Sequence, residues 1–126
     1  TNFLPVAVET VIEDVAIARL PDGQVLRARS SGDGPRGGEA TLAVRPEKVA
    51  LAFEAPEGLA AGWNRLDGTL AEVVYLGAHT QYVVALPAGD RVVAHRQNRA
   101  LGGFEPRVGD PLTVAFDPAC ATLLGE

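Results

Sequence analysis

The chain has 126 residues, of which 47% are hydrophobic and 21% are charged, and its net charge is -5. This composition is typical of a folded globular chain and excludes the low hydrophobicity and high charge of intrinsic disorder. The acidic balance and a single lysine, Lys48, argue against nucleic-acid binding by phosphate neutralisation. The single cysteine, Cys120, excludes an intramolecular disulfide and a multi-cysteine metal site.

The first residues do not predict a targeting signal. No apolar run approaches the roughly 18 residues of a membrane span, and the first residues lack the basic-then-apolar pattern of a signal peptide. The chain begins at Thr1 without a methionine and runs directly into the apolar residues 3–6. We therefore expect a piece cut from a longer protein.

The first half of the chain consists of short apolar runs separated by turn-forming residues, a pattern that indicates β-strands. The predicted strands span residues 6–12, 15–20, 24–29, 40–44 and 48–53, and residues 21–23, Pro-Asp-Gly, predict a hairpin turn. Residues 30–38 are rich in glycine and serine and predict a surface loop. Gly38 and Glu39 stand where a P-loop requires Lys and Ser or Thr, so this loop does not predict a phosphate site.

The second half continues the same pattern after a loose segment at 54–66, in which we expect Trp63 to pack against the barrel wall. Predicted strands span 68–76, 80–86, 91–96 and 112–116, with a turn at 77–79 and a short helical turn near 98–102. Short antiparallel strands at this spacing favour closure, because an open sheet would leave unpaired edges. The sequence therefore predicts an all-β fold of small OB-type β-barrels. We expect one region, 1–126, in which strands from 1–55 and 67–126 share one core.

No set of residues predicts catalysis. His79 falls in a predicted turn and His95 in a strand, so a metal site would need scattered carboxylates as further ligands. Glu13, Asp14 and Asp117 are predicted to be acids at turns or strand ends. The aromatic residues are spread over the chain and do not indicate a surface on which bases stack. We expect no catalytic, cofactor-binding or metal site in this chain.

Four stretches carry a resemblance to a known family. They are TLAVRPEKVALAF at 41–53, GTLAEVVYLGAHTQYVVAL at 68–86, VVAHRQNR at 92–99 and GDPLTVAFDPACATLL at 109–124. In this order they resemble the transport-associated OB (TOBE) domain, the C-terminal regulatory region of ATP-binding subunits of bacterial ABC importers. The start of the chain and the spacing of the stretches look most like importers of polyamines, iron and related organic solutes.

The resemblance implies a non-catalytic regulatory and dimerisation domain. In the intact protein it would couple ATP hydrolysis to uptake of a polyamine, such as spermidine or putrescine, or of a related solute. ATP and Mg²⁺ would bind in an ATPase domain absent from this chain. The implied partners are a second copy, membrane permease subunits reached through the ATPase domain, and a small-molecule regulator, but no nucleic acid. The implied location is the inner face of the bacterial cell membrane.

An alternative from another class is a free-standing OB-like module that binds a small ligand or single-stranded nucleic acid. The reading frame before Thr1 would distinguish the two, because a P-loop there indicates the importer and a start codon the module.

Residues 45–47, Arg-Pro-Glu, match the tripeptide characteristic of the TOBE domain family. Proline lacks an N–H and biases the preceding residue to extended geometry, so Pro46 predicts the end of the 40–44 strand and an extended Arg45. If the extended geometry persists, Arg45 and Glu47 point to the same side. We predict that the Arg45 guanidinium holds a seam between modules, the alternatives being an exposed turn pair or direct ligand contact. Gln97 and Asn98, at a strand end, are predicted to satisfy local backbone groups or to contact a partner.

Overall fold

The computed structural model describes residues 1–30, 37–53, 62–97 and 105–124. Its elements are β1 (Asn2–Ile12), β2 (Val15–Arg19), β3 (Val25–Arg29), β4 (Gly38–Val44), η1 (Pro46–Lys48), β5 (Ala50–Ala52), β6 (Asn64–Tyr75), β7 (His79–Ala85), β8 (Arg91–Gln97), β9 (Pro111–Phe116), η2 (Pro118–Cys120) and β10 (Ala121–Leu124). Here β marks a strand and η a single turn of 3₁₀-helix. The predicted all-β class with small OB-type barrels is confirmed.

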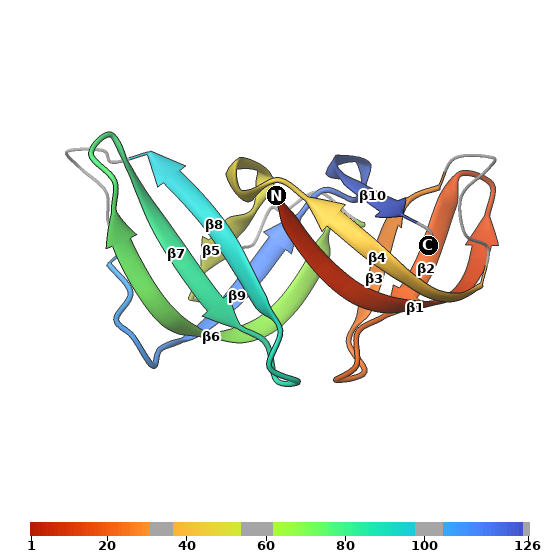
Figure 1. The fold of residues 1–126 in the computed structure, drawn as a ribbon, viewed down its shortest axis with the longest axis horizontal. Coiled ribbons are helices and arrows are strands. Elements are labelled where there is room, and N and C mark those ends of the chain that lie inside the picture. The colour runs from red at the N-terminus through yellow and green to blue at the C-terminus, as the bar shows by residue number, and fades with distance from the viewer. Residues whose placement is uncertain (31–36, 54–61, 98–104, 125–126) are drawn as a thin grey trace.

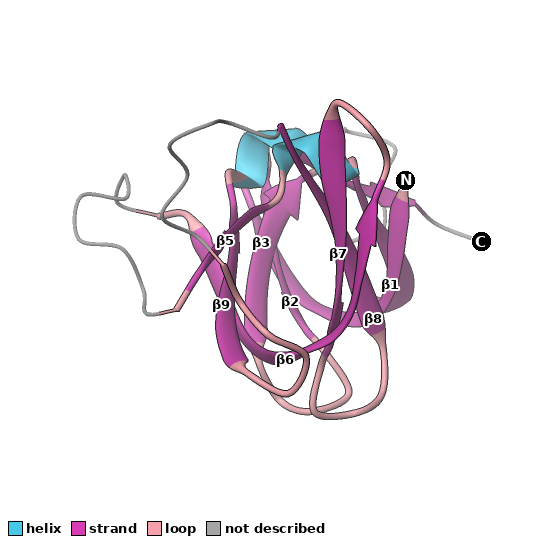
Figure 2. Cartoon of the chain, turned by 90° about the vertical axis from the view of Figure 1, so that its left-hand side faces the viewer, coloured by secondary structure: helices cyan, strands magenta, loops and turns pink. Residues whose placement is uncertain are grey.

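The strands form two sheets that lie side by side (Figure 1). The first is a closed barrel in the order β1-β2-β3-β10-β4. The second, which we call the open sheet, has the order β5-β9-β6-β7-β8. Figure 2 shows η1 and η2 close together at one end of the molecule, and Figure 1 shows the β2–β3 and β7–β8 turns at the opposite end.

The order of the elements occurs twice along the chain. Four strands, a 3₁₀ turn and a short strand make up β1 to β5, and the same order makes up β6 to β10. The second hairpin of each half even has the same hydrogen bonds: Leu20 N donates to Gln24 O at 2.9 Å, and Leu86 N donates to Asp90 O at 2.7 Å. The sequence analysis did not predict this internal repeat.

Each half gives its last strand to the other half. Strand β5 pairs with β9, and β10 pairs with β4 antiparallel and with β3 through one parallel bridge, Thr122 to Arg29. The exchange follows the short 3₁₀ turns, because Pro46 and Pro118 begin the turns that redirect the chain after β4 and β9.

The core lies inside the two sheets and follows the strict alternation of the strands. In β1, residues 2, 4, 6 and 8 are buried while 3, 5 and 7 are exposed, as expected when successive side chains point to opposite faces. Phe116 and Leu66 from the open sheet, and Leu4 and Leu42 from the closed barrel, are fully buried. Buried apolar residues from both halves make one continuous cluster.

Several predicted boundaries differ from the structure. Strand β1 begins at Asn2, four residues before the predicted strand, and His79 opens β7 instead of lying in the preceding turn. Strand β10 was not predicted, because its four residues were too short a run to recognise. Trp63 is half-buried, and the helical turn predicted near 98–102 lies largely outside the described residues. Within the described ranges, no helix has the length and apolar character needed to cross a membrane.

Candidate functional site at the seam between the two sheets

The predicted site residues Arg45, Pro46 and Glu47 lie where β4 leaves the closed barrel. Arg45 is extended, with φ -76° and ψ 142°, which confirms the predicted effect of Pro46 on its neighbour. The extended geometry then stops: Lys48 N donates to Arg45 O at 3.0 Å and Val49 N to Pro46 O at 3.2 Å, closing the turn η1. The condition under which Arg45 and Glu47 would point to the same side is therefore not met.

This turn lies against the open sheet, because η1 contacts β8. The side chains of Arg45 and Glu47 are exposed, and within the described ranges neither makes a hydrogen bond or an ion pair. Gln97 is the exposed last residue of β8, and Asn98 falls outside the described residues. The role predicted for these residues in holding the seam or contacting a partner stays a prediction.

Two buried asparagines join the sheets instead. The Asn2 amide donates to Val93 O at 2.7 Å and accepts from Val93 N at 2.7 Å. The Asn64 amide donates to Arg27 O at 2.7 Å and accepts from Arg27 N at 2.8 Å. Asn2 opens β1 and Asn64 opens β6, and their exposed fractions are 5% and 4%. Each amide thus replaces a neighbouring strand at a sheet edge, where a buried backbone group without a partner would be costly.

Among the residues that the structure describes, a second amide clamp exists at only one of these junctions. Gln24 Oε1 accepts from Asp67 N at 2.7 Å, and its Nε2 donates to Asp67 O at 3.3 Å. Asp22 orients Gln24 by accepting from its backbone N at 2.8 Å. At the other junction the repeat places Asp90 and Pro5 in the corresponding positions, and proline has no N–H to donate. The junction at Asn64 is therefore clamped twice and the junction at Asn2 once.

The seam also contains the free edges of the open sheet. No pairing joins β5 to β8, and a cavity of about 230 Å³ lies between them, lined in part by Ala50 and His95. Beside it, His95 Nε2 lies 2.9 Å from Gln81 Oε1, and the rings of His95 and His79 have centroids 4.8 Å apart. In the part of the chain that the structure describes, no group of three or more His, Cys, Asp or Glu side chains could hold a metal ion.

One tyrosine inside the open sheet, Tyr82, has a raised pKa. Burial raises the pKa of the Tyr82 hydroxyl above its usual value of 10.0, with Arg96 acting in the opposite direction. This shift follows from packing in the core.

The sequence analysis missed the asparagines, although a signal was present. Asn2 stands in phase with Leu4 and Val6, and Asn64 stands in phase with Leu66, so each amide occupies an inward position of an amphipathic strand. A polar side chain at an inward position of a strand needs a buried hydrogen-bond partner. The alternation of the sequence can therefore reveal such a residue.

The chain is similar to ATP-binding proteins of importers. It is 41% identical to the spermidine/putrescine import ATP-binding protein PotA of Rubrobacter xylanophilus over 99% of this chain and 32% of that protein. It is 34% identical to PotA of Ruegeria pomeroyi over 100% of this chain and 32% of that protein. The Fe(3+) ions import ATP-binding protein FbpC of Agrobacterium fabrum matches 77% of this chain and 25% of that protein at 30% identity.

The fold is similar to that of a solved binding protein. The cytoplasmic molybdate-binding protein ModG, with molybdate bound, superposes with a TM-score of 0.87 over 99% of this chain and 96% of that chain. The identity is 18%, so this likeness concerns the fold alone.

The chain spans about a third of the length of the importer proteins that it matches over its whole length. A family model for the TOBE domain matches residues 42–124, which confirms the resemblance and identifies the chain as a non-catalytic region and not the ATP-hydrolysing part. Because the matched residues make up well over half of the chain, the chain belongs to the TOBE domain family.

Proposed function

We propose that this chain is the regulatory and dimerisation domain of the ATP-binding subunit of an ABC importer for a polyamine such as spermidine or putrescine, or for a related solute. One observation carries the proposal: a PotA protein matches 99% of the chain at 41% identity. In the intact subunit, the domain would couple ATP hydrolysis elsewhere in the protein to uptake. ATP and Mg²⁺ would bind in that other part.

The seam supports a mechanical role for the domain. Three amide clamps hold the two sheets together through backbone groups, so the two halves would move as one body when a neighbour pushes on either. A domain of this kind transmits contacts from a second copy of the subunit, or from a small-molecule regulator, without chemistry of its own. The subunit would work at the inner face of the cell membrane with permease partners.

The proposal is tested in the full-length protein that contains this chain. A bacterial strain without its own polyamine-importer ATP-binding subunit receives the full-length gene, or the same gene without residues 1–126, together with the cognate permease genes. We expect the full-length gene to restore uptake of labelled spermidine or putrescine, and the shortened protein to bind ATP but to transport poorly or without regulation. Restored uptake of Fe³⁺ alone would contradict the polyamine assignment, and full transport by the shortened protein would contradict the regulatory role.

Dimerisation is tested separately by sedimentation of the chain. We expect a concentration-dependent dimer. A monomer at every concentration would place the dimer contact in the remainder of the subunit and would contradict this part of the proposal.

A free-standing small-ligand module is the second candidate, and one observation favours it. ModG is matched over 96% of its own length, so a protein of this size and fold exists that binds a small anion. A gene that begins at this chain would favour this candidate over the importer subunit.

A further inference from the structure

The two histidines of the chain lie next to each other on the open sheet. His79 opens β7, His95 lies in β8, and the centroids of their rings are 4.8 Å apart at an interplanar angle of 43°. Figure 1 shows β7 and β8 side by side, and their pairing sets Gln81 opposite His95. The sequence analysis did not predict this approach, because it placed His79 in a turn.

The contact with Gln81 fixes the tautomer of His95. His95 Nε2 lies 2.9 Å from Gln81 Oε1, and an amide oxygen only accepts, so Nε2 carries the ring proton. In the neutral ring, Nδ1 then keeps its lone pair. This arrangement is typical of an imidazole that binds a metal, because the hydrogen bond of one ring nitrogen orients the ring and raises the basicity of the other.

The spacing of the two rings suits a shared metal ion. Zn²⁺ binds imidazole nitrogens at about 2.0–2.1 Å in tetrahedral geometry, which sets two bound rings with centroids about 5 Å apart. The observed 4.8 Å is close to this distance. Both histidines are half-buried, so solvent reaches them and water can complete the coordination. Arg96 follows His95 in the strand and therefore lies on the opposite face of the sheet.

We infer that His79 and His95 form a binding site for a divalent transition-metal ion of the Zn²⁺ type, with Gln81 as a positioning residue. Imidazole is a ligand of Zn²⁺, Cu²⁺ and Ni²⁺, whereas Mg²⁺ and Ca²⁺ prefer oxygen ligands. Two protein ligands are fewer than a closed structural site has, so water would occupy the remaining positions. The inference rests on the two imidazoles and does not depend on the proposed function.

The repeat gives the closed barrel different chemistry at the equivalent place. It has the pair Val15 and Arg29 where the open sheet has Gln81 and His95. His79 has no counterpart in the closed barrel, because the β6–β7 hairpin is longer than the β1–β2 hairpin. The inferred site therefore belongs to the open sheet alone.

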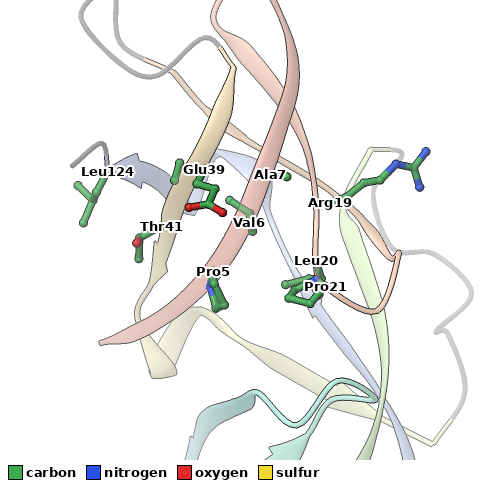
Figure 3. Close-up of a pocket in the computed structure, with 10 residues that line it drawn as sticks. Pro5, Val6, Ala7, Arg19, Leu20, Pro21, Glu39, Thr41 and Leu124 are labelled. Carbon is green, nitrogen blue, oxygen red and sulfur yellow. The ribbon is translucent and has the colours of Figure 1, made fainter.

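A carboxylate on the closed barrel provides a control for general attraction of cations. A groove of about 450 Å³ lies on the outer surface of that barrel, and Figure 3 shows Glu39 and Thr41 among its lining residues. Glu39 is exposed, so its replacement by glutamine changes the net charge of the chain without altering the open sheet.

The test is an NMR titration of the ¹⁵N-labelled chain, without a polyhistidine tag, with ZnCl₂ or MgCl₂ at one ionic strength. The pH is about 7.5, where most imidazoles are neutral. Before Zn²⁺ is added, we expect the His95 ring to carry its proton on Nε2. Zn²⁺ should then shift the ring nitrogens of both histidines in a saturable titration, and Mg²⁺ should shift neither.

The decisive comparison is between variants. His79→Gln and His95→Gln should each weaken Zn²⁺ binding at least about tenfold, because only one imidazole remains. Gln81→Ala should weaken binding and also give His95 a mixture of tautomers, which a merely structural role would not change. Glu39→Gln should leave binding unchanged, as should Cys120→Ser, which removes the one thiol of the chain.

A second readout is the urea midpoint of unfolding. Zn²⁺ should raise it in the parent chain and not in His79→Gln, since an ion that binds the folded chain preferentially stabilises it. Shifts at only one histidine, weakening by Glu39→Gln equal to that by His79→Gln, or loss of binding in Cys120→Ser would overturn the inference. The absence of saturable shifts would overturn it as well.

Discussion

The closed barrel and the open sheet have the same order of strands but differ at the strand that each receives from the other half. Strand β10 pairs with β4 and also reaches β3, where Thr122 meets Arg29 and closes the barrel. Strand β5 occupies the same place in the open sheet, pairs with β9 and does not reach β8. In the repeat, Ala50 and His95 are the residues equivalent to Thr122 and Arg29. A cavity lies between Ala50 and His95, where the closed barrel has a bridge.

The interiors of the two sheets explain this difference. The open sheet holds Phe116 and Tyr82 where the closed barrel holds Val44 and Ala16, and all four are buried. Side chains inside a small barrel set how closely its strands can approach, and two aromatic rings fill more space than a valine and an alanine. The comparison teaches that closure depends here on the volume of the interior, while the order of the strands stays the same.

The largest loss of stability is expected when a large side chain is removed from the interior of the open sheet. Phe116→Ala should lower the free energy of unfolding by about 3–5 kcal/mol, because Phe116 is fully buried and its removal leaves a cavity. Val44→Ala, at the same place in the closed barrel, removes fewer carbon atoms and should cost less. Urea denaturation followed by circular dichroism measures both. Equal losses would show that the two interiors are packed alike, against the comparison drawn above.

The junctions between the sheets should differ in strength as well. Asn2→Ala and Asn64→Ala each remove two hydrogen bonds to a strand edge and should each cost about 1–3 kcal/mol. Asn2→Ala should cost more, since the junction at Asn64 keeps the second clamp made by Gln24 and Asp67.

Amide hydrogen exchange provides a local readout of the same junctions. We expect Val93 to lose more protection in Asn2→Ala than Arg27 loses in Asn64→Ala. The reverse order would mean that the clamp at Gln24 contributes nothing.

A glycine in the open sheet is predicted to tolerate no side chain. A Cβ added at Gly68 would lie 2.5 Å from Val84 Cγ1 and 3.1 Å from the backbone oxygen of Ala85, and the backbone atom cannot move aside without disturbing the ladder. Gly68→Ala should therefore cost about 1–3 kcal/mol in urea denaturation. Gly37→Ala is the matched control, because an added Cβ there has nothing within 4 Å. A neutral Gly68→Ala would show that β6 and β7 can separate freely at this point.

The stability of the chain should depend differently on the residues that precede the two 3₁₀ turns, Arg45 before η1 and Asp117 before η2. Asp117 Oδ1 accepts from Ala119 N at 2.9 Å and caps η2, whereas Arg45 makes no capping bond to η1. Asp117→Ala should cost about 0.5–2 kcal/mol by thermal unfolding, and Arg45→Ala less than about 0.5 kcal/mol. A cost above about 1 kcal/mol for Arg45→Ala would instead support the guanidinium as a seam-holding group.

The smallest effect is a loss of stability at alkaline pH that is specific to the open sheet. Because burial raises the pKa of Tyr82, the folded chain keeps its phenolic proton to higher pH than the unfolded chain does. The resulting stability is fully present below the unfolded pKa of 10.0 and is lost as the pH rises through the folded pKa. Tyr82→Phe should show a smaller decline in urea midpoint between about pH 9 and about pH 11. An identical decline in both proteins would exclude Tyr82 as the cause.

The sequence predicted the strands and the barrel class well, because alternating apolar residues and turn residues act locally. The extended geometry of Arg45 was also predictable, since it follows from the ring of Pro46. The exchange of β5 and β10 was not predicted, because it depends on pairings between residues far apart in the chain. The repeat left a visible signal in the turns LPDGQ at 20–24 and LPAGD at 86–90.

Within the described ranges, the seam contains side-chain contacts that the sequence analysis did not predict. A guanidinium was expected to hold it, whereas the observed bonds come from Asn2, Asn64 and Gln24, whose side-chain amides each offer both a donor and an acceptor. A strand edge presents both kinds of group, so one amide can satisfy an N–H and a C=O together, whereas a guanidinium, which only donates, could bind only the C=O. Arg45 itself keeps its predicted role until the variant above is measured.

The exchange of strands also determines when the closed barrel can be completed during synthesis of the chain. The barrel built from the first strands lacks a wall until β10, at 121–124, has left the ribosome. The closed barrel therefore lacks one of its strands until nearly all of the second half has been translated. A ribosome that stalls after η2 would release a polypeptide with an unfilled gap between β3 and β4, a natural target for chaperones and proteases.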